Sequence, residues 1–291
     1  YVQSMRKDMY LPYAQKLVEQ GLAYYCFCSK ERLDSLKGDS EFSQGYDRHC
    51  RDLPKSEVER LLKENVPYVI RQKMPLEGST TFEDSVFGTI TVENSELEDQ
   101  ILIKTDGYPT YNFANVIDDH SMNITHVVRG CEYLSSTPKY NLLYEALGFD
   151  IPTYIHLPLI MGKNDDGTVS KLSKRHGAVS FNELINDGFL PEAIINYIAF
   201  LGFCPEENRE IFSLDELVKI FSIDRISKSP AIFDYDKLSW FNSEYIRMMP
   251  LDKFADLAAP YIKKAIGEDF DFKKIAAILQ KRVAKFTEIK D

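Results

Sequence analysis

The sequence predicts an α/β fold with three successive parts. Period-two alternation of apolar residues dominates positions 68–104, strand and helix patterns alternate from about 110 to 181, and the remainder from Asn182 almost to Asp291 has helical character. Strand, helix and strand joined by long connections are typical of a parallel sheet. We therefore expect a parallel sheet, preceded by an α+β segment and followed by helices.

The first two elements are a helix and a strand. Apolar residues at helical spacing predict a helix over 4–20, and Gly21 is suited to end it. The apolar and aromatic segment 22–28 predicts a strand. Its two cysteines, Cys26 and Cys28, are two residues apart, so an extended backbone points both thiols to the same face.

The elements up to residue 104 are predicted from caps and alternation. Ser29 is the expected N-cap of a short helix that ends near Gly38, and Ser56 with Glu59 has the spacing of a capping box for a second helix. Three strands are expected in segments separated by Gly, Asn and acidic residues: 68–72, 86–92 and 100–104.

Strands and helices alternate in the next part of the chain. Segment 126–129 predicts a strand, and Thr137 and Pro138 are the expected N-cap and first residue of a helix. A strand over 155–161 then leads into a polar loop at 162–167. Prolines mark expected breaks in the helical remainder: Pro191, Pro205, Pro230, Pro250 and Pro260.

Composition and charge exclude several classes of protein. The 291 residues, 44% hydrophobic and 27% charged, are ordinary for a globular chain and exclude collagen, wholesale disorder and a coiled coil. Without a run of eighteen apolar residues or a signal peptide, we expect a cytoplasmic protein that does not enter a membrane. A net charge of −10 counts against a nucleic-acid partner for the chain as a whole, but a basic patch on one face could still bind one. We expect no DNA partner.

Three of the five cysteines lie near the start of the chain and suggest a metal site. Cys26, Cys28 and Cys50 offer three thiolates to a tetrahedral zinc. A fourth ligand could come from three nearby side chains: Tyr46, His49 or Asp52. The alternative is that these are reduced, buried cysteines that act as small hydrophobic residues.

A basic loop follows the predicted strand and its polar loop. Lys171, Ser173, Lys174 and Arg175 precede Gly177 and form a cationic loop suited to charge that develops on a phosphorus centre. The segment is not a Walker loop, because the spacing of its glycines and lysines differs from that motif. The alternative is a solvated basic surface.

A third group of polar residues lies near the predicted sheet. Tyr111 and Asn115 offer hydrogen-bonding groups, and Arg129 lies at the carboxyl end of a strand, where open α/β sheets bind ligands. Arginine grips carboxylates with two parallel hydrogen bonds. The alternatives are a core aromatic role for Tyr111 and simple solvation of a helix end by Asp118 and Asp119.

These motifs, in this order, resemble bacterial-type glutamyl-tRNA synthetase, a class I aminoacyl-tRNA synthetase. The resemblance covers nearly the whole chain and rests on separated segments: Tyr1–Ser4 with Arg6, Tyr108–Asn115, Thr125–Gly130, Ser136–Pro138 and, above all, Lys171–Arg175. It implies a partial Rossmann-like catalytic domain with an inserted α+β domain of zinc type and a helical stem domain.

The resemblance also implies domain boundaries. Residues 1–23 would end the first half of the nucleotide-binding fold, and residues 24–109 would form the inserted domain that binds the tRNA acceptor end. The second half of the nucleotide-binding fold, with the basic loop, would span 110–181. A helical stem-contact domain would follow at 182–250, and an anticodon-binding region would begin at 251–291.

The resemblance assigns roles to particular residues. Lys174, and secondarily Lys171, would be catalytic. The residues that would bind ATP are Lys171, Ser173, Lys174, Arg175, Glu132 and Tyr133. Those that would bind glutamate are Tyr111, Asn115 and Arg129, with Arg129 on the side-chain carboxylate. Those that would bind a structural zinc are Cys26, Cys28, Tyr46 and Cys50, with Asp52 as the alternative fourth ligand.

The implied activity is that of a glutamate–tRNA ligase, with L-glutamate, Mg-bound ATP and tRNA(Glu) as substrates. Cys131 and Tyr133 depart from the acidic residue and Trp usual in the family, and the family's His-Ile-Gly-His-like motif has no counterpart. We therefore expect an internal fragment that is inactive alone. Two alternatives are a non-catalytic, zinc-bearing tRNA-binding module and a tRNA-modifying relative, although such shortened relatives lack the long helical tail.

Overall fold

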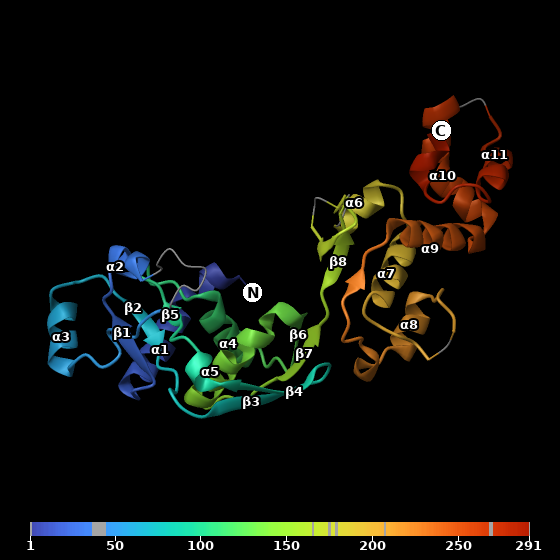
Figure 1. Cartoon of the computed structure of the whole chain (residues 1–291). Helices are drawn as coiled ribbons and strands as arrows, with labels where there is room; N and C mark the ends of the chain where they lie inside the picture. Colours follow the sequence, from blue (N-terminus) through green and yellow to red (C-terminus); the bar gives the residue numbers. More distant parts are fainter. Residues whose placement is uncertain are drawn as a thin grey trace. The chain divides into compact units, whose positions relative to one another are not determined.

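The computed structural model describes residues 2–36, 45–164, 166–173, 176–177, 180–206, 208–267 and 270–290 (Figure 1). The chain forms two compact units, Tyr1–His156 and Leu157–Asp291. The division between them falls inside the segment 110–181 that the predicted boundaries keep together. The finer division into five parts stays a prediction.

The first predicted helix is two elements in the structure. A 3-10 helix, η1 (Gln3–Met9), precedes α1 (Tyr10–Glu19). No residue of η1 is buried, whereas α1 buries Tyr10, Ala14 and Leu17. The regular α-helix therefore begins where apolar side chains first reach the core, because packing of an apolar face supplies most helix stability in proteins.

A three-stranded antiparallel sheet follows, in the order β1 (Ala23–Cys26), β2 (Val69–Gln72) and β5 (Ile101–Ile103). Between β1 and β2 lie α2 (Lys30–Ser35) and α3 (Lys55–Lys63). The predicted cap at Ser29 is confirmed, since its hydroxyl accepts from the Arg32 backbone N–H. The predicted capping box at Ser56 is wrong, because α3 already begins at Lys55 and Pro54 is its N-cap.

The second sheet has the order β4 (Gly88–Glu93), β3 (Ser79–Asp84), β7 (Thr153–Leu157) and β6 (His126–Gly130). Strands β3 and β4 form an antiparallel hairpin, and η2 (Asn94–Glu96) follows it. Strand β3 pairs with β7 in parallel. Strand β3 has no counterpart among the predicted strands, and the strand predicted over 86–92 is β4, which begins at Gly88. Val86 lies in the hairpin turn.

Three helical segments complete the first unit: α4 (Tyr111–Ser121), η3 (Cys131–Ser136) and α5 (Thr137–Leu147). Helix α5 ends at Gly148, which has a φ of 73°, a conformation that glycine adopts without steric cost. Its N-cap position is Ser136, one residue before the prediction. Residues of α1, β1, β2, β5, α4 and α5 form one hydrophobic core, which includes Tyr10, Ile70, Phe113 and Leu143.

The second unit begins with a small sheet in the order β10 (Ala231–Ile232), β8 (Ile160–Lys163) and β9 (Val169–Lys171). The strand predicted over 155–161 is therefore two strands, β7 and β8. Pro158 lies between them and cannot donate a backbone hydrogen bond, which explains the interruption.

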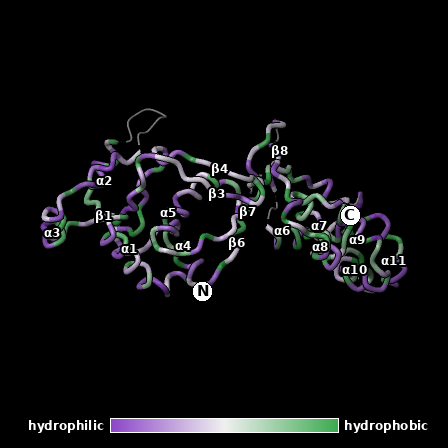
Figure 2. Tube along the Cα trace, turned by 90° about the horizontal axis from the view of Figure 1, so that it is seen from below, coloured by the Kyte–Doolittle hydropathy of each residue, from purple (hydrophilic) through white to green (hydrophobic). Residues whose placement is uncertain are grey.

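Helices build the rest of the second unit: α6 (Phe181–Asn186), α7 (Pro191–Phe200), α8 (Leu214–Ile220), η5 (Ile223–Arg225), α9 (Tyr235–Met248), α10 (Leu251–Ile266), α11 (Phe272–Leu279) and η6 (Phe286–Lys290). Hydrophobic and hydrophilic segments alternate along these helices (Figure 2). Two apolar cores result, one around Phe241 and the other around Phe254. The break predicted at Pro260 is wrong, because α10 continues through it with Ala258 and Ile262 buried on either side.

Across the described ranges, no helix combines the length and the apolar character that crossing a bilayer needs.

Candidate functional site

The predicted glutamate-binding residues line one open cavity in the first unit. Tyr111 and Asn115 come from α4, and Arg129 comes from the end of β6. Tyr111 and Asn115 are four residues apart and therefore lie on the same helix face. The cavity is completed by residues of η1, α4 and β6 that include Gln3, Asp118, Asp119 and His126. Tertiary folding thus brings together the three side chains that sequence analysis grouped.

Arg129 is held from one side of its guanidinium group. Its Nε donates to His156 Nε2 at 3.0 Å, and its Nη2 donates to Thr137 Oγ1 at 2.9 Å. The rings of Tyr133 and Tyr140 lie 5.1 and 4.7 Å from the guanidinium carbon. Its Nη1 has no hydrogen-bond partner among the residues that the structure describes. The cation is therefore oriented by protein contacts, while part of its donor set is available to an anion in the cavity.

Carboxylates lie on the α4 side of the same cavity. Asp118 accepts from Tyr10 Oη at 2.9 Å and pairs with Arg6 at 3.1 Å, so it has specific partners beyond solvent. Burial, and then the neighbouring Asp118 charge, raise the pKa of the Asp119 carboxyl. A cavity lined by a fixed cation, amide and hydroxyl groups and a carboxyl suits a small amino acid with several charges.

Two residues important to Arg129 were missed by sequence analysis. His156 belongs to β7 and Asp84 ends β3, and the His156 Nδ1 lies 2.6 Å from Asp84 Oδ2. Both side chains are fully buried. Because 72 positions separate them in the chain, no local pattern could reveal the pair.

The residues predicted to contact ATP are in two places. Glu132 and Tyr133 belong to η3 directly after β6, with Glu132 exposed and the Tyr133 ring 5.9 Å from that of Tyr111. Lys171 ends β9 in the second unit, and Ser173 follows it. The other two predicted residues, Lys174 and Arg175, lie outside the described residues.

His176 secures the base of the basic loop. Its Nδ1 accepts from the Ser173 backbone N–H at 3.0 Å, and its Nε2 lies 2.9 Å from Asn164 Oδ1. The imidazole packs over Gly162, where an added Cβ would lie 2.5 Å from the ring. Only glycine therefore fits beneath His176 without a shift of the loop. No local sequence pattern indicates this role of His176.

The three predicted thiols lie together in the first unit. The sulfur atoms of Cys26, Cys28 and Cys50 are all within 4.8 Å of one another. The Tyr46 hydroxyl lies 3.2 Å from the Cys26 sulfur and 3.8 Å from the Cys28 sulfur. Side-chain hydrogen bonds with Cys50, and also with Tyr46, lower the pKa of the Cys26 thiol despite its burial. All three cysteines are free thiols.

The other candidate ligands lie apart from this cluster. Asp52 is 81% exposed at its side chain and pairs with Lys73 at 3.0 Å. His49 is also exposed. Of the described His, Cys, Asp and Glu residues, the group that could hold a metal comprises the three cysteines.

A buried carboxylate anchors the loop that contains Cys50. Asp99 accepts from Arg51 Nη1 at 2.8 Å and from Tyr24 Oη at 2.8 Å, and its side chain is fully buried. The Arg71 guanidinium stacks 3.8 Å from the Tyr46 ring centre. Protein contacts therefore hold the loop of Cys50 and the Tyr46 ring in place beside the other two thiols.

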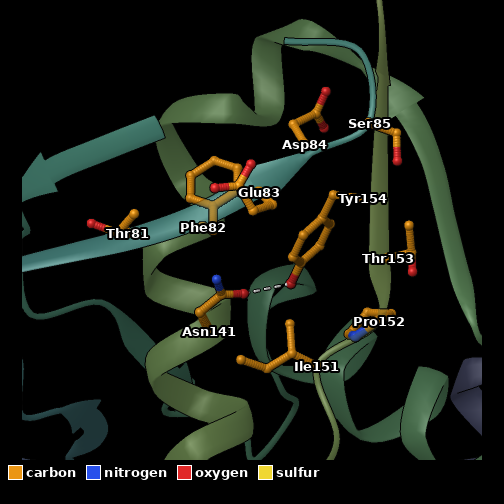
Figure 3. Close-up of a pocket in the computed structure, with 10 residues that line it drawn as sticks. All are labelled: Thr81, Phe82, Glu83, Asp84, Ser85, Asn141, Ile151, Pro152, Thr153 and Tyr154. Carbon is orange, nitrogen blue, oxygen red and sulfur yellow. Dashed lines mark hydrogen bonds between the residues drawn. The ribbon is translucent and has the colours of Figure 1, made fainter. Parts of the chain in front are cut away.

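A second cavity of the first unit lies beside β3 and β7 and contains no predicted functional residue. Its lining includes Asn141, Tyr154 and Asp84 (Figure 3). The Tyr154 hydroxyl is directed at the Asn141 side chain and donates to its Oδ1 at 2.8 Å (Figure 3). This contact belongs to the buried framework beneath β7.

The chain matches one family of known proteins over most of its length. The model of the family "tRNA synthetases class I (E and Q), catalytic domain" matches residues 1–240, and the chain belongs to this family. Within it, the chain is similar to glutamate–tRNA ligases. It is 56% identical to that of Clostridium botulinum (strain Hall), over 99% of this chain and 59% of that protein. It is 58% identical to that of Clostridium novyi (strain NT), over 99% of this chain and 59% of that protein.

Two solved structures agree with these sequence relatives. The glutamate tRNA ligase of Elizabethkingia meningosepticum, in complex with its amino acid, superposes with a TM-score of 0.90 at 36% identity. The glutamate–tRNA synthetase of Elizabethkingia anophelis gives the same TM-score and identity. Each match covers 99% of this chain and 63% of the other. The chain spans about three fifths of the length of the curated relatives it matches.

Proposed function

We propose that the chain forms most of the catalytic part of a glutamate–tRNA ligase that acts in the cytoplasm. The observation that supports this most strongly is the cavity that Arg129, Tyr111 and Asn115 line together. The relatives of this chain are glutamate–tRNA ligases. One of the similar solved structures is a glutamate tRNA ligase in complex with its amino acid. L-glutamate, Mg-bound ATP and tRNA(Glu) would be the substrates.

The proposed first step joins glutamate to AMP. An oxygen of the substrate α-carboxylate attacks the α-phosphorus of ATP, and the bond from that phosphorus to the β-phosphate oxygen breaks, which releases pyrophosphate. Because the substrate supplies its own nucleophile, catalysis consists mainly of positioning and charge stabilisation. Lys174 and Lys171 would stabilise the negative charge on the triphosphate, with Ser173 and Arg175 of the same loop as further contacts to ATP.

In the proposed second step, a hydroxyl of the terminal tRNA ribose attacks the glutamyl carbonyl and AMP leaves.

The remaining contacts of the two substrates come from other segments. Glu132 and Tyr133, in the segment after β6, would contact ATP in the first step. For the RNA, we propose that the inserted segment 24–109 contacts the acceptor end and that helices in 182–250 contact the stem, with the anticodon-binding region beginning at 251–291.

The same cavity would select glutamate over glutamine. Arg129 offers only N–H donors, which match a carboxylate with two acceptor oxygens. A glutamine side chain would place its own NH₂ group against these donors or lose one hydrogen bond. Such an unpaired donor in a half-buried site opposes binding.

For the cysteine cluster, we propose a structural zinc bound by Cys26, Cys28, Cys50 and Tyr46. The sulfur atoms of Cys28 and Cys50 are 3.5 Å apart, and the Tyr46 hydroxyl lies 3.2 and 3.8 Å from the sulfurs of Cys26 and Cys28. These separations are close to the distance of about 3.5–3.8 Å expected between two ligand atoms of a tetrahedral zinc. Four protein ligands would leave no position for a reactive water. The zinc would tie β1 to the loop of Cys50 and have no part in adenylate formation.

Removal of this zinc should affect tRNA charging more than adenylate formation. In a longer form of the protein that spans the full length of its relatives, the Cys28→Ser variant should lose bound zinc. Metal analysis under reducing conditions measures this loss. The variant's tRNA charging should fall about tenfold or more, with glutamate-dependent ATP–pyrophosphate exchange changed less than twofold. Cys204→Ser is the matched control, because Cys204 is an exposed free thiol in the second unit. Absence of zinc from the unmodified protein, with normal charging by Cys28→Ser, would contradict this proposal.

The 291 residues alone should not catalyse adenylate formation. They contain no His-x-Gly-His sequence, which the family uses on the other side of the ATP phosphates. Pyrophosphate exchange by the purified chain is therefore expected to stay at background, while the protein at the length of its relatives exchanges readily. Robust glutamate-dependent exchange by the 291 residues would show that the clamp on ATP is complete within them.

A further inference from the structure

We propose that the buried pair Asp84 and His156 positions Arg129 to bind the side-chain carboxylate of the amino acid substrate. This inference rests on the proposed function and adds two positioning residues to it. The pair lies in the first unit, with Asp84 at the end of β3, His156 in β7 and Arg129 near the end of β6.

The hydrogen bonds determine which ring nitrogen of His156 holds the proton. Arg129 Nε can only donate, so His156 Nε2, 3.0 Å away, must accept. The neutral imidazole then has its proton on Nδ1, and this N–H donates to Asp84 Oδ2 at 2.6 Å. Asp84 therefore fixes the tautomer of His156, and the tautomer in turn provides the acceptor for Arg129.

Asp84 is itself fixed by the backbone. Its Oδ1 accepts from the N–H groups of Val86 and Phe87 in the hairpin turn, at 2.9 and 2.8 Å. Its Oδ2 also accepts from the His156 backbone N–H at 3.1 Å. The carboxylate thus joins the turn after β3 to β7 and has little freedom to rotate.

The electrostatics of the site keep His156 neutral. Burial is the largest influence and lowers its pKa, and the Arg129 charge acts in the same direction, whereas Asp84 and Glu132 oppose them. A protonated ring would place a second N–H against Arg129 Nε and repel the guanidinium. The neutral ring instead holds Arg129 at Nε, and Thr137 holds it at Nη2, so the remaining N–H groups have a defined direction.

Two substitutions of His156 separate positioning from simple packing. The His156→Asn side chain can still reach Asp84 but is too short to accept from Arg129, whereas the His156→Gln side chain can place its amide oxygen where Nε2 lies. In the protein at the length of its relatives, His156→Asn should raise the KM for glutamate in pyrophosphate exchange about tenfold or more, with the KM for ATP changed less than twofold. His156→Gln should restore most of the glutamate affinity.

Tyr154→Phe is the matched control. It removes another buried hydrogen bond on the same strand, from Tyr154 Oη to Asn141, without removing a hydrogen bond of Arg129. Whatever the change in its melting temperature, its KM for glutamate should stay within twofold of the unmodified protein. Equal increases in KM for both variants, or an unchanged KM in His156→Asn, would overturn the positioning role.

The outcomes distinguish this inference from the proposed function. If the unmodified protein shows no glutamate-dependent exchange, the proposed function fails, whatever the His156 variants do. If both His156 variants fail to fold, the tautomer in the unmodified protein decides, measured from the ¹⁵N shifts of the His156 ring. A proton on Nδ1 at neutral pH is expected, and a proton on Nε2 would overturn the inference.

Discussion

In the Lys174→Ala variant, glutamate-dependent ATP–pyrophosphate exchange is expected to fall by about two to three orders of magnitude. Lys174 would place a full positive charge against the triphosphate where negative charge develops, and loss of one such donor typically costs a factor of this size. Glutamate binding should persist, because the residues proposed to hold the amino acid lie in the cavity of the first unit. Steady-state exchange and calorimetric titration with glutamate measure the two effects separately.

Lys163→Ala provides a matched control for the loss of a lysine. Lys163 is an exposed residue at the end of β8, the strand that pairs with β9, and it has no proposed role. Its substitution should leave exchange within twofold of the unmodified protein. An unchanged exchange rate in Lys174→Ala would show that the basic loop is a solvated surface and would remove the catalytic assignment.

The Arg129→Gln variant should lose glutamate activation by about two orders of magnitude or more in kcat/KM. A hydrogen bond to a charged group contributes about 1.5–3 kcal/mol, and the substrate carboxylate would lose two such bonds. Because about 1.4 kcal/mol corresponds to a factor of ten, the loss amounts to about two orders of magnitude or more. The KM for ATP should change little. Because glutamine no longer meets a full set of N–H donors, the preference for glutamate over glutamine should also shrink.

Arg129→Lys tests whether geometry or charge is required at this position. Lysine keeps the charge but lacks the planar fork and cannot reproduce both hydrogen bonds to His156 and Thr137. We expect an activity between those of the unmodified protein and Arg129→Gln. Near-UV circular dichroism should confirm that both variants are folded. A KM for glutamate within threefold of normal in Arg129→Gln would exclude Arg129 as the ligand of the side-chain carboxylate.

Several features of the fold and of the site could be predicted from local sequence. The two-residue spacing of Cys26 and Cys28 predicted that their thiols lie close together, and the structure does bring the three sulfurs together. The predicted strand over 22–28 is shorter than expected, because β1 ends at Cys26 and Cys28 lies beyond it. Ser29 caps α2 as predicted. Arg129 lies near the end of β6, also as predicted. These predictions succeeded because backbone periodicity and capping depend on residues only a few positions apart.

Local signals also gave errors where packing decided between alternatives. The Ser56 pattern satisfied the capping-box rule, yet α3 begins one residue earlier, with Pro54 as the N-cap. Pro260 suggested a break, yet the buried face of α10 continues past it. Strand β3 was missed, although its alternation of buried and exposed residues is regular and its hairpin partner β4 follows directly, because Phe82 is its one apolar residue and the strand shows no apolar alternation in the sequence.

The sequence by itself therefore determined the family resemblance, most of the strands and helices, and the residue types that would bind a metal, a triphosphate and a carboxylate. Only the tertiary structure decided how Arg129 is held. His156 and Asp84 come from strands separated by 72 positions, and the contact between them exists because β3 pairs in parallel with β7. The carboxylate of Asp99 likewise meets Arg51 and Tyr24 only after β1, β2 and the loop of Cys50 have come together. Such contacts depend on which strands become neighbours, and no short-range pattern contains that information.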